Sequence, residues 1–162
     1  NAKRLGIPIT VFESDIFDSV YNVEKNPCYL CARMRRGHLY SKAQELGCNK
    51  IAYAHHKDDV IDSFLMSMLY EGRIHTFSPV THLEKSGVTL IRPLIYALEG
   101  EIRAFARAND LPVCKNPCPA DGVTKRQESK DIIDELKVRV PDVKDRIFSS
   151  IEGAGIDGWS RH

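Results

Sequence analysis

Lys50-Ile-Ala-Tyr-Ala-His-His-Lys-Asp-Asp-Val-Ile-Asp-Ser-Phe64 predicts a strand that runs directly into a helix. The apolar run at 51–54 has the length of a short buried strand, and the apolar residues after Asp59 recur at helical spacing. In open α/β sheets, anionic ligands bind where a strand ends and the next helix begins, because the unpaired N–H groups and the positive end of the helix dipole point there. We therefore expect a functional site at this junction.

Five titratable residues occupy the junction: His55, His56, Lys57, Asp58 and Asp59. Each has a structural explanation when it is taken singly, since carboxylates in a first helical turn are favoured by the dipole and histidine often ends a strand. All five together at one strand-to-helix junction are also a candidate for a functional cluster.

The composition indicates one globular domain. The chain has 162 residues, of which 43% are hydrophobic and 28% charged, with a formal net charge of +1. That charge argues against a strongly basic nucleic-acid binder, so any RNA contact must come from a local patch. No apolar run is long enough to cross a bilayer and the first residues lack a signal-peptide pattern, so we expect a cytoplasmic protein without a membrane partner.

The predicted elements alternate between strands and helices, which favours an α/β fold with a parallel sheet. We expect residues 1–152 to form one domain and residues 153–162 to be a flexible tail, because the chain is glycine-rich there. The expected elements are a strand at 7–12, a helix at 30–46, the junction strand and helix at 51–72, a hairpin at 74–81 and 88–91, a helix at 99–108, and two helices after Lys125.

Five cysteines in a chain of this kind predict thiols, metal ligands or catalysts more than a disulfide framework. Cys28-Tyr-Leu-Cys31 opens a helix, where thiolates are favoured and metals bind. A buried, inert pair and a thioredoxin-type pair are the alternatives, the latter disfavoured because no strand precedes it. Further donors are available at Cys114 and Cys118: four cysteines suit zinc, and three with one open position suit an iron–sulfur cluster.

Basic residues flank both cysteine segments. If the segments meet in space, these cations form a positive surface that suits a phosphate backbone. Otherwise these basic residues lie on solvated helix faces, where neighbouring acidic residues balance their charge. The residues concerned are Arg33, Arg35, Arg36, Lys42, Lys115, Lys125, Arg126 and Lys130.

Four ordered motifs resemble the PP-loop ATPases that thiolate tRNA, and most of all the group that forms 2-thiocytidine. They are Pro27-Cys-Tyr-Leu-Cys-Ala-Arg-Met-Arg-Arg-Gly37, Lys50-Ile-Ala-Tyr-Ala-His-His-Lys-Asp-Asp59, Ile91-Arg-Pro-Leu94, and Cys118 ahead of Lys125-Arg-Gln127. The resemblance extends from about residue 5 to residue 151. It implies an α/β fold with the parallel sheet of the HUP, or adenine nucleotide alpha hydrolase-like, class.

The resemblance also implies a reaction. In that family ATP adenylates the carbonyl oxygen of a tRNA base, and a sulfur species held at a [4Fe-4S] cluster then displaces AMP. The implied cofactors are ATP, Mg²⁺ and the cluster, and the implied partners are tRNA and a sulfur donor such as a cysteine desulfurase. The family's first strand and its Ser-Gly-Gly-x-Asp-Ser phosphate loop are absent from these residues. We therefore expect a C-terminal portion that is inactive alone and that forms a homodimer over an exposed sheet edge.

Matching the motifs gives individual residues a role. Cys28, Cys31 and Cys118 would be the cluster ligands, and Cys114 would be a spare. Asp59 falls on the carboxylate expected to act in catalysis. The resemblance puts Ala54, His55 and Arg35 at the ATP, with Ala54 where the family usually has glycine. The expected tRNA contacts are Arg33, Arg36, Lys125 and Arg126.

Two rival interpretations stay open at this point. One is a non-enzymatic module in which the cysteines hold structural zinc and the arginines bind RNA. The other is a PP-loop enzyme that thiolates a different tRNA base. The identity of the metal separates the first rival from the enzyme.

Overall fold

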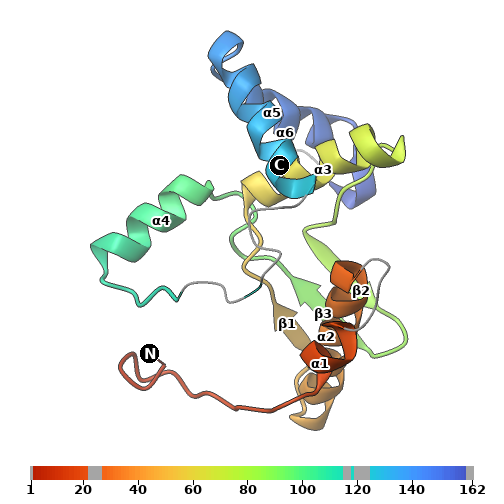
Figure 1. Ribbon diagram of the computed structural model, residues 1–162, viewed down its shortest axis with the longest axis vertical. Helices are drawn as coiled ribbons and strands as arrows, with labels where there is room; N and C mark the ends of the chain where they lie inside the picture. The colour runs from red at the N-terminus through yellow and green to blue at the C-terminus, as the bar shows by residue number, and fades with distance from the viewer. Residues whose placement is uncertain (1, 22–26, 115–117, 119–124, 160–162) are drawn as a thin grey trace.

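The structure is a computed structural model that describes residues 2–21, 27–114, 118 and 125–159. It contains both helices and strands, as Figure 1 shows. The elements are α1 (Ile16–Tyr21), α2 (Pro27–Glu45), β1 (Lys50–Ala52), α3 (Lys57–Glu71), β2 (Val80–Leu83), β3 (Val88–Ile91), α4 (Glu99–Ala108), α5 (Lys125–Arg139), α6 (Val143–Gly153) and a 3₁₀ helix, η1 (Ile156–Gly158).

The three described strands form a mixed sheet in the order β1-β3-β2. β1 is parallel to β3, with Ile51 opposite Leu90, so the parallel pair expected of an α/β fold is present. β2 is antiparallel to β3, and the two form the predicted hairpin. Its first strand begins at Val80 instead of residue 74, because the Thr76 N–H donates to the Asp157 carboxylate at 2.8 Å and not to a strand.

The N-terminal segment differs from the prediction. The predicted strand at 7–12 joins no described strand, although its alternating residues Ile7, Ile9 and Val11 have a strand pattern and are 55%, 70% and 79% exposed. The polar connection after it contains a short helix, α1, which buries Val20. Apolar alternation indicates a strand only where a partner strand is available.

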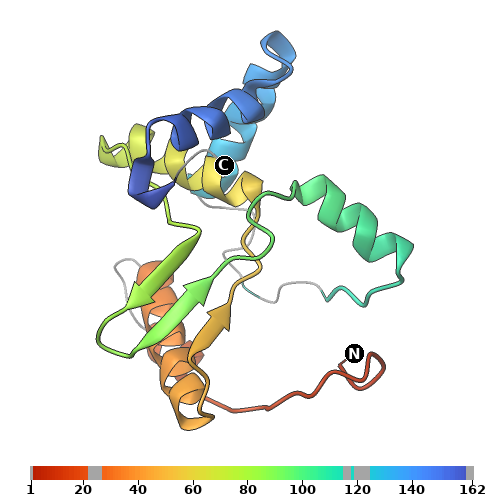
Figure 2. The same cartoon turned by 180° about the vertical axis from the view of Figure 1, so that it is seen from behind.

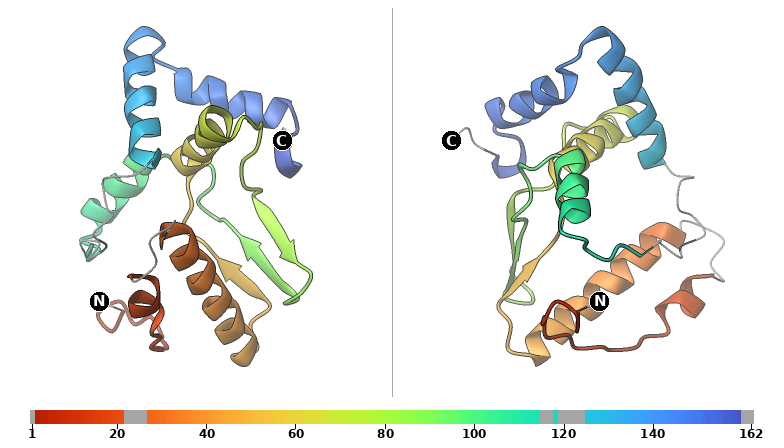
Figure 3. Two further views of the ribbon diagram at one scale, coloured as in Figure 1. Left: turned by 45° about the vertical axis from the view of Figure 1, so that its right-hand side comes forward. Right: turned by 90° about the vertical axis from the view of Figure 1, so that its left-hand side faces the viewer.

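Helix α2 covers one face of the sheet, and α3, α5 and α6 form a separate layer beyond the carboxyl end of β1 (Figures 2 and 3). A small core under α2 is made by Ala43, Ile51, Val88 and Leu90. The larger core lies among the three helices around Val60, Ile61, Leu65, Ile133, Phe148 and Ile151. Helix α4 projects from the body and buries no residue. None of the described helices is long and apolar enough to cross a membrane.

Helix α3 buries two carboxylates against its neighbours. Asp58 accepts from the Glu99 N–H at 2.7 Å and from the Lys144 ammonium at 2.6 Å, which joins α3 to α4 and α6. Burial opposes the charge on Asp58, but these two bonds outweigh it and hold its pKa below the usual range. Asp62 is 3% exposed and its Oδ2 has no hydrogen-bond partner among the described residues. Burial raises the pKa of Asp62 to about 6, against the opposing charges of Lys130 and Arg126.

The expectation of a flexible tail is wrong for residues 153–159. η1 follows α6, and Trp159 is 2% exposed within the larger core. The Trp159 indole N–H donates to the Phe77 carbonyl at 3.1 Å, and its ring lies 5.1 Å from that of Phe148. The glycine-rich composition hid this single buried anchor.

Truncating that anchor tests its role. We expect Trp159→Ala to lower the free energy of unfolding by about 3–5 kcal/mol, because it leaves a large cavity in the core. Urea denaturation measures the change, and Val138→Ala, at an 85% exposed position, is the control. A loss below about 0.5 kcal/mol, typical of a surface change, would mean that the tail is loose.

The burial of Asp62 predicts an unusual dependence of stability on pH. The folded-state pKa of about 6 lies above the usual 3.8, so folding favours the protonated acid. Stability associated with Asp62 is therefore present below pH 3.8 and is lost as the pH rises through 6. Relative to wild type, Asp62→Asn should gain up to about 3 kcal/mol between pH 4 and pH 7. Thermal unfolding across this range tests it, with the exposed Asp131→Asn as control; equal pH profiles for wild type and Asp62→Asn would contradict it.

Candidate functional site

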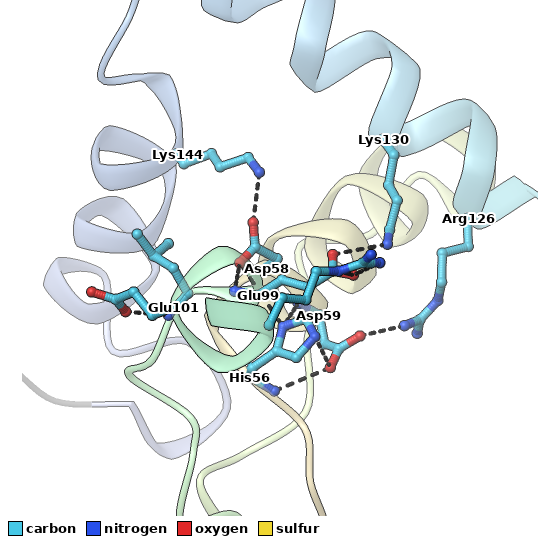
Figure 4. A network of polar contacts seen from close by, with 10 residues as sticks. His56, Asp58, Asp59, Glu99, Glu101, Arg126, Lys130 and Lys144 are labelled. Carbon is cyan, nitrogen blue, oxygen red and sulfur yellow. Dashed lines mark hydrogen bonds and ion pairs between the residues drawn. The ribbon is translucent and has the colours of Figure 1, made fainter. Parts of the chain in front are cut away.

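A reciprocal cap fixes the junction between β1 and α3. The Tyr53 N–H donates to the Ile91 carbonyl at 2.9 Å, which extends the strand pair by one residue. His56 is the N-cap of α3: its ring Nδ1 accepts from the Asp59 N–H at 3.4 Å, and the Asp59 carboxylate accepts from the His56 N–H at 3.1 Å (Figure 4). The capping box sets where α3 begins and which way Asp59 points.

Asp59 also forms an ion pair with Arg126. The Asp59 Oδ1 lies 2.6 Å from the Arg126 Nη1, and this contact joins α3 to α5 across 67 residues of sequence. The family resemblance implies separate roles for these two residues, catalysis for Asp59 and tRNA binding for Arg126, and the structure brings them together. Both carboxylate oxygens of Asp59 accept hydrogen bonds, Oδ1 from Arg126 and Oδ2 from the His56 N–H, so a metal ion or substrate must share one of them or displace Arg126.

The five titratable junction residues divide into two groups. Asp58 and Lys57 face the helical layer: the Lys57 ammonium lies 2.6 Å from the Asp145 carboxylate and 4.9 Å from the centre of the Phe148 ring. These two residues are structural. His55 lines the cleft described below, Asp59 is not among the lining residues but pairs with Arg126, which is, and His56 caps the helix.

A cleft with a volume of about 720 Å³ opens at the carboxyl ends of β1 and β3, beside α2. Its lining combines two kinds of side chain. The cations are Arg35, Arg36, Arg92 and Arg126. The rings are Phe12, His38, Tyr40, Tyr53, His55 and Phe77.

Two rings of the cleft, those of His55 and Tyr53, are uncharged at neutral pH. Burial lowers the pKa of His55, which Asp59 only partly opposes, so its imidazole is neutral. Burial and the hydrogen bond with Tyr40 raise the pKa of Tyr53 to about 12, and the two hydroxyls lie 3.5 Å apart. The arginines therefore set the charge of the cleft, and an anionic ligand with an aromatic part, such as a nucleotide, suits it.

The predicted binding residues are only partly gathered in this cleft. Arg35, Arg36, His55 and Arg126 line it. Three others are not among its lining residues: Ala54 is exposed after β1, Arg33 is exposed on α2, and Lys125 pairs with Glu128 at 2.9 Å. Lys115 lies outside the described residues.

Two of the three predicted cluster ligands lie close together on one helix. Cys28 and Cys31 are three residues apart in the first turn of α2, a spacing that puts both thiols on one helix face. Their position at a helix N-terminus suits two thiolate ligands. Cys118 is exposed between α4 and α5, and among the described residues no group of three potential ligands lies close enough to hold a metal.

Arg92 was missed as a site residue, although the sequence contained a signal for it. Arg92 directly follows β3 within the motif Ile91-Arg-Pro-Leu94. The carboxyl ends of parallel strands meet at one sheet edge, so a charged residue after β3 must lie near the β1 junction. Only the pairing of β1 with β3 makes this visible.

Comparison with known proteins agrees with this geometry. Residues 2–128 match the family model described as the PP-loop domain. A tRNA-cytidine(32) 2-sulfurtransferase of Ralstonia nicotianae is 34% identical over 93% of this chain and 49% of its own length. The enzyme of that name from Geobacter sulfurreducens is 38% identical over 76% of this chain and 49% of its own length.

A solved structure also matches. The U34-tRNA thiolase NcsA from Methanococcus maripaludis, determined with its [4Fe-4S] cluster, gives a TM-score of 0.75 at 26% identity, over 94% of this chain and 53% of that chain. The chain spans about half the length of the curated relatives it matches. Because the family model covers most of its residues, the chain belongs to the PP-loop family.

Proposed function

We propose that this chain is part of an enzyme that transfers sulfur to a tRNA base in an ATP-dependent reaction. The observation that carries the proposal is the cleft at the ends of β1 and β3, where four arginines and neutral rings lie beside the capped carboxylate of Asp59. Such a cleft combines phosphate-binding charge with surfaces on which bases stack. The C-terminal portion of the domain, residues 1–152, would supply this part of the site.

The proposed reaction has two steps. The carbonyl oxygen of the base attacks the α-phosphorus of ATP, so an O–P bond forms and pyrophosphate leaves. A sulfur nucleophile then attacks the activated carbon, and AMP leaves with the oxygen. Negative charge grows on the phosphates in the first step, and Arg35 would stabilise it there. His55 and Ala54 would lie against the nucleotide, and Asp59 would bind Mg²⁺ or polarise the amide of the base.

We propose that the sulfur is supplied at a [4Fe-4S] cluster held by Cys28, Cys31 and Cys118. The one-turn spacing of the first two thiols at the N-terminus of α2 supports their part. The third ligand would come from the connection between α4 and α5, which precedes Arg126. When bound, such a cluster leaves one iron free to hold sulfur.

The proposed substrate base is cytidine 32 of tRNA, since the relatives at 34% and 38% identity have that name. The matching structure is a thiolase for U34, which keeps a uridine enzyme as the second candidate. Arg36 and Arg126 would contact the tRNA from the cleft, and Arg33 and Lys125 from outside it.

We further propose a cytoplasmic enzyme that receives sulfur from a cysteine desulfurase or a similar donor. A homodimer is part of the proposal because β1 is an edge strand of the described sheet. Free strand edges are commonly covered by another chain or element.

Replacing the central carboxylate tests the function. In an anaerobic assay of the complete enzyme with tRNA, Mg-ATP and sulfide, we expect Asp59→Asn to slow thiolation by roughly 100-fold, as for loss of one group that acts on the transition state. Mass spectrometry of the tRNA nucleosides measures the product and identifies the base. Asp145→Asn is the matched control, because Asp145 is an exposed carboxylate that pairs with Lys57. Unchanged thiolation by Asp59→Asn would contradict the assignment.

Cysteine substitutions test the cluster. After anaerobic reconstitution with iron and sulfide, Cys118→Ala should lose the thiolate-to-iron absorbance and most of its bound iron, whereas Cys114→Ala should keep both. Iron analysis and absorbance spectra provide the measurement. If Cys114→Ala loses the cluster and Cys118→Ala keeps it, Cys114 is the third ligand instead. A colourless protein with one tightly bound zinc would support a structural zinc site.

A further inference from the structure

Arg92 is a buried cation without a carboxylate partner in the described part of the chain. It is 9% exposed, and its Nε is buried without a hydrogen-bond partner among the described residues. No described acidic residue forms an ion pair with Arg92. Of its neighbours, the phenols of Tyr53 and Tyr40 would favour the protonated guanidinium, but only if they carried negative charge. Burial of a guanidinium without a counter-charge is costly, so such a charge needs an explanation.

The surroundings of Arg92 hold its guanidinium in one orientation. Its plane lies over the Phe77 ring, 4.9 Å from the centroid, and Phe77 in turn lies 4.8 Å from the His55 ring. Its Nη1 donates to the Ser78 carbonyl and to the Thr81 hydroxyl, the latter at 3.2 Å. A neutral donor would satisfy these two acceptors equally well, so the two bonds do not account for a full charge at this position.

Arg92 lines the cleft together with Arg35 and Arg36, and no described carboxylate forms an ion pair with it there. The Tyr53 phenol is the neighbouring acid, and its pKa of about 12 leaves it uncharged at neutral pH. Asp59 is committed to Arg126 and to the N-cap of α3.

We infer that Arg92 binds an anion, namely a phosphate group that enters the cleft beside the ends of β1 and β3. A planar guanidinium with free N–H groups matches a phosphate in shape and charge. The phosphate belongs to a nucleotide or to the tRNA backbone. The choice between these sources rests on the proposed function, but the anion site itself rests on the cleft alone.

The first experiment uses the wild-type chain and inorganic pyrophosphate. Arginine Nε–H resonances are followed by NMR during the titration, and the Arg92 signal is assigned by its absence in Arg92→Lys. We expect a saturable shift of the Arg92 signal, while the signal of Arg73, which pairs with Glu71 outside the cleft, stays in place. Saturable shifts at Arg35 or Arg36 without one at Arg92, or no saturable shift at all, would overturn the inference.

The second experiment identifies the source of the phosphate. Affinities for tRNA and for Mg-ATP are measured separately in the complete enzyme, as wild type and as Arg92→Gln. If Arg92 contacts a tRNA phosphate, the plot of the log of the tRNA association constant against the log of the salt concentration should be less steep in the variant. The slope should be smaller in magnitude by roughly 0.7–0.9, the value of one phosphate contact. A nucleotide phosphate predicts roughly tenfold weaker ATP binding, as for one charge-assisted contact, with an unchanged tRNA slope.

Matched variants separate the effect of the Arg92 charge on binding from the effect of its packing. Arg92→Lys keeps the charge and should keep the tRNA slope, and Arg73→Gln removes an exposed arginine outside the cleft and should keep both affinities. If wild type binds tRNA and ATP and Arg92→Gln alters neither, the inference fails and the proposed function stands. If wild type binds neither but pyrophosphate shifts Arg92, the proposed function fails and the anion site stands. Should Arg92→Gln not fold, the wild-type titration decides.

Discussion

The carboxylate of Asp59 is the contact on which the rest of the site depends. One of its oxygens accepts from the N-cap of α3 and the other pairs with Arg126 of α5. The first contact fixes the side chain at the end of β1, and the second draws α5 to the same place. Asp58, one residue earlier, ties α3 to α4 and α6 in the opposite direction. Two adjacent carboxylates therefore orient the helical layer relative to the sheet.

The position of the cleft follows from strand pairing. Because β1 and β3 are parallel, the residues that follow them, Tyr53 and Arg92, meet at one edge, where α2 adds Arg35 and Arg36. Local sequence predicted the junction, since an apolar run and an amphipathic helix are both local signals. The family motifs assigned His55 and Arg35 to the ATP and Arg36 to the tRNA, and the structure places all three around the cleft.

Other features depend on contacts that local patterns do not encode. The apolar alternation at 7–12 predicts a strand, but pairing needs a partner strand. Trp159 follows a glycine-rich segment and is nevertheless buried, because Phe77 and Phe148 lie where it arrives. Arg92 and Asp62 look like ordinary surface charges in sequence, and their burial follows from packing between distant elements. The spacing of Cys118 alone likewise cannot show how it approaches α2.

The central claim is that this protein thiolates tRNA, with cytidine as the base. Its most direct test is the nucleoside content of tRNA from cells in which the gene is deleted, measured by mass spectrometry beside the parent strain. The account predicts that 2-thiocytidine disappears, that thiolated uridines persist, and that the intact gene restores 2-thiocytidine. Persistence of 2-thiocytidine with loss of a thiolated uridine would contradict the cytidine assignment. An unchanged set of thionucleosides would contradict tRNA thiolation altogether.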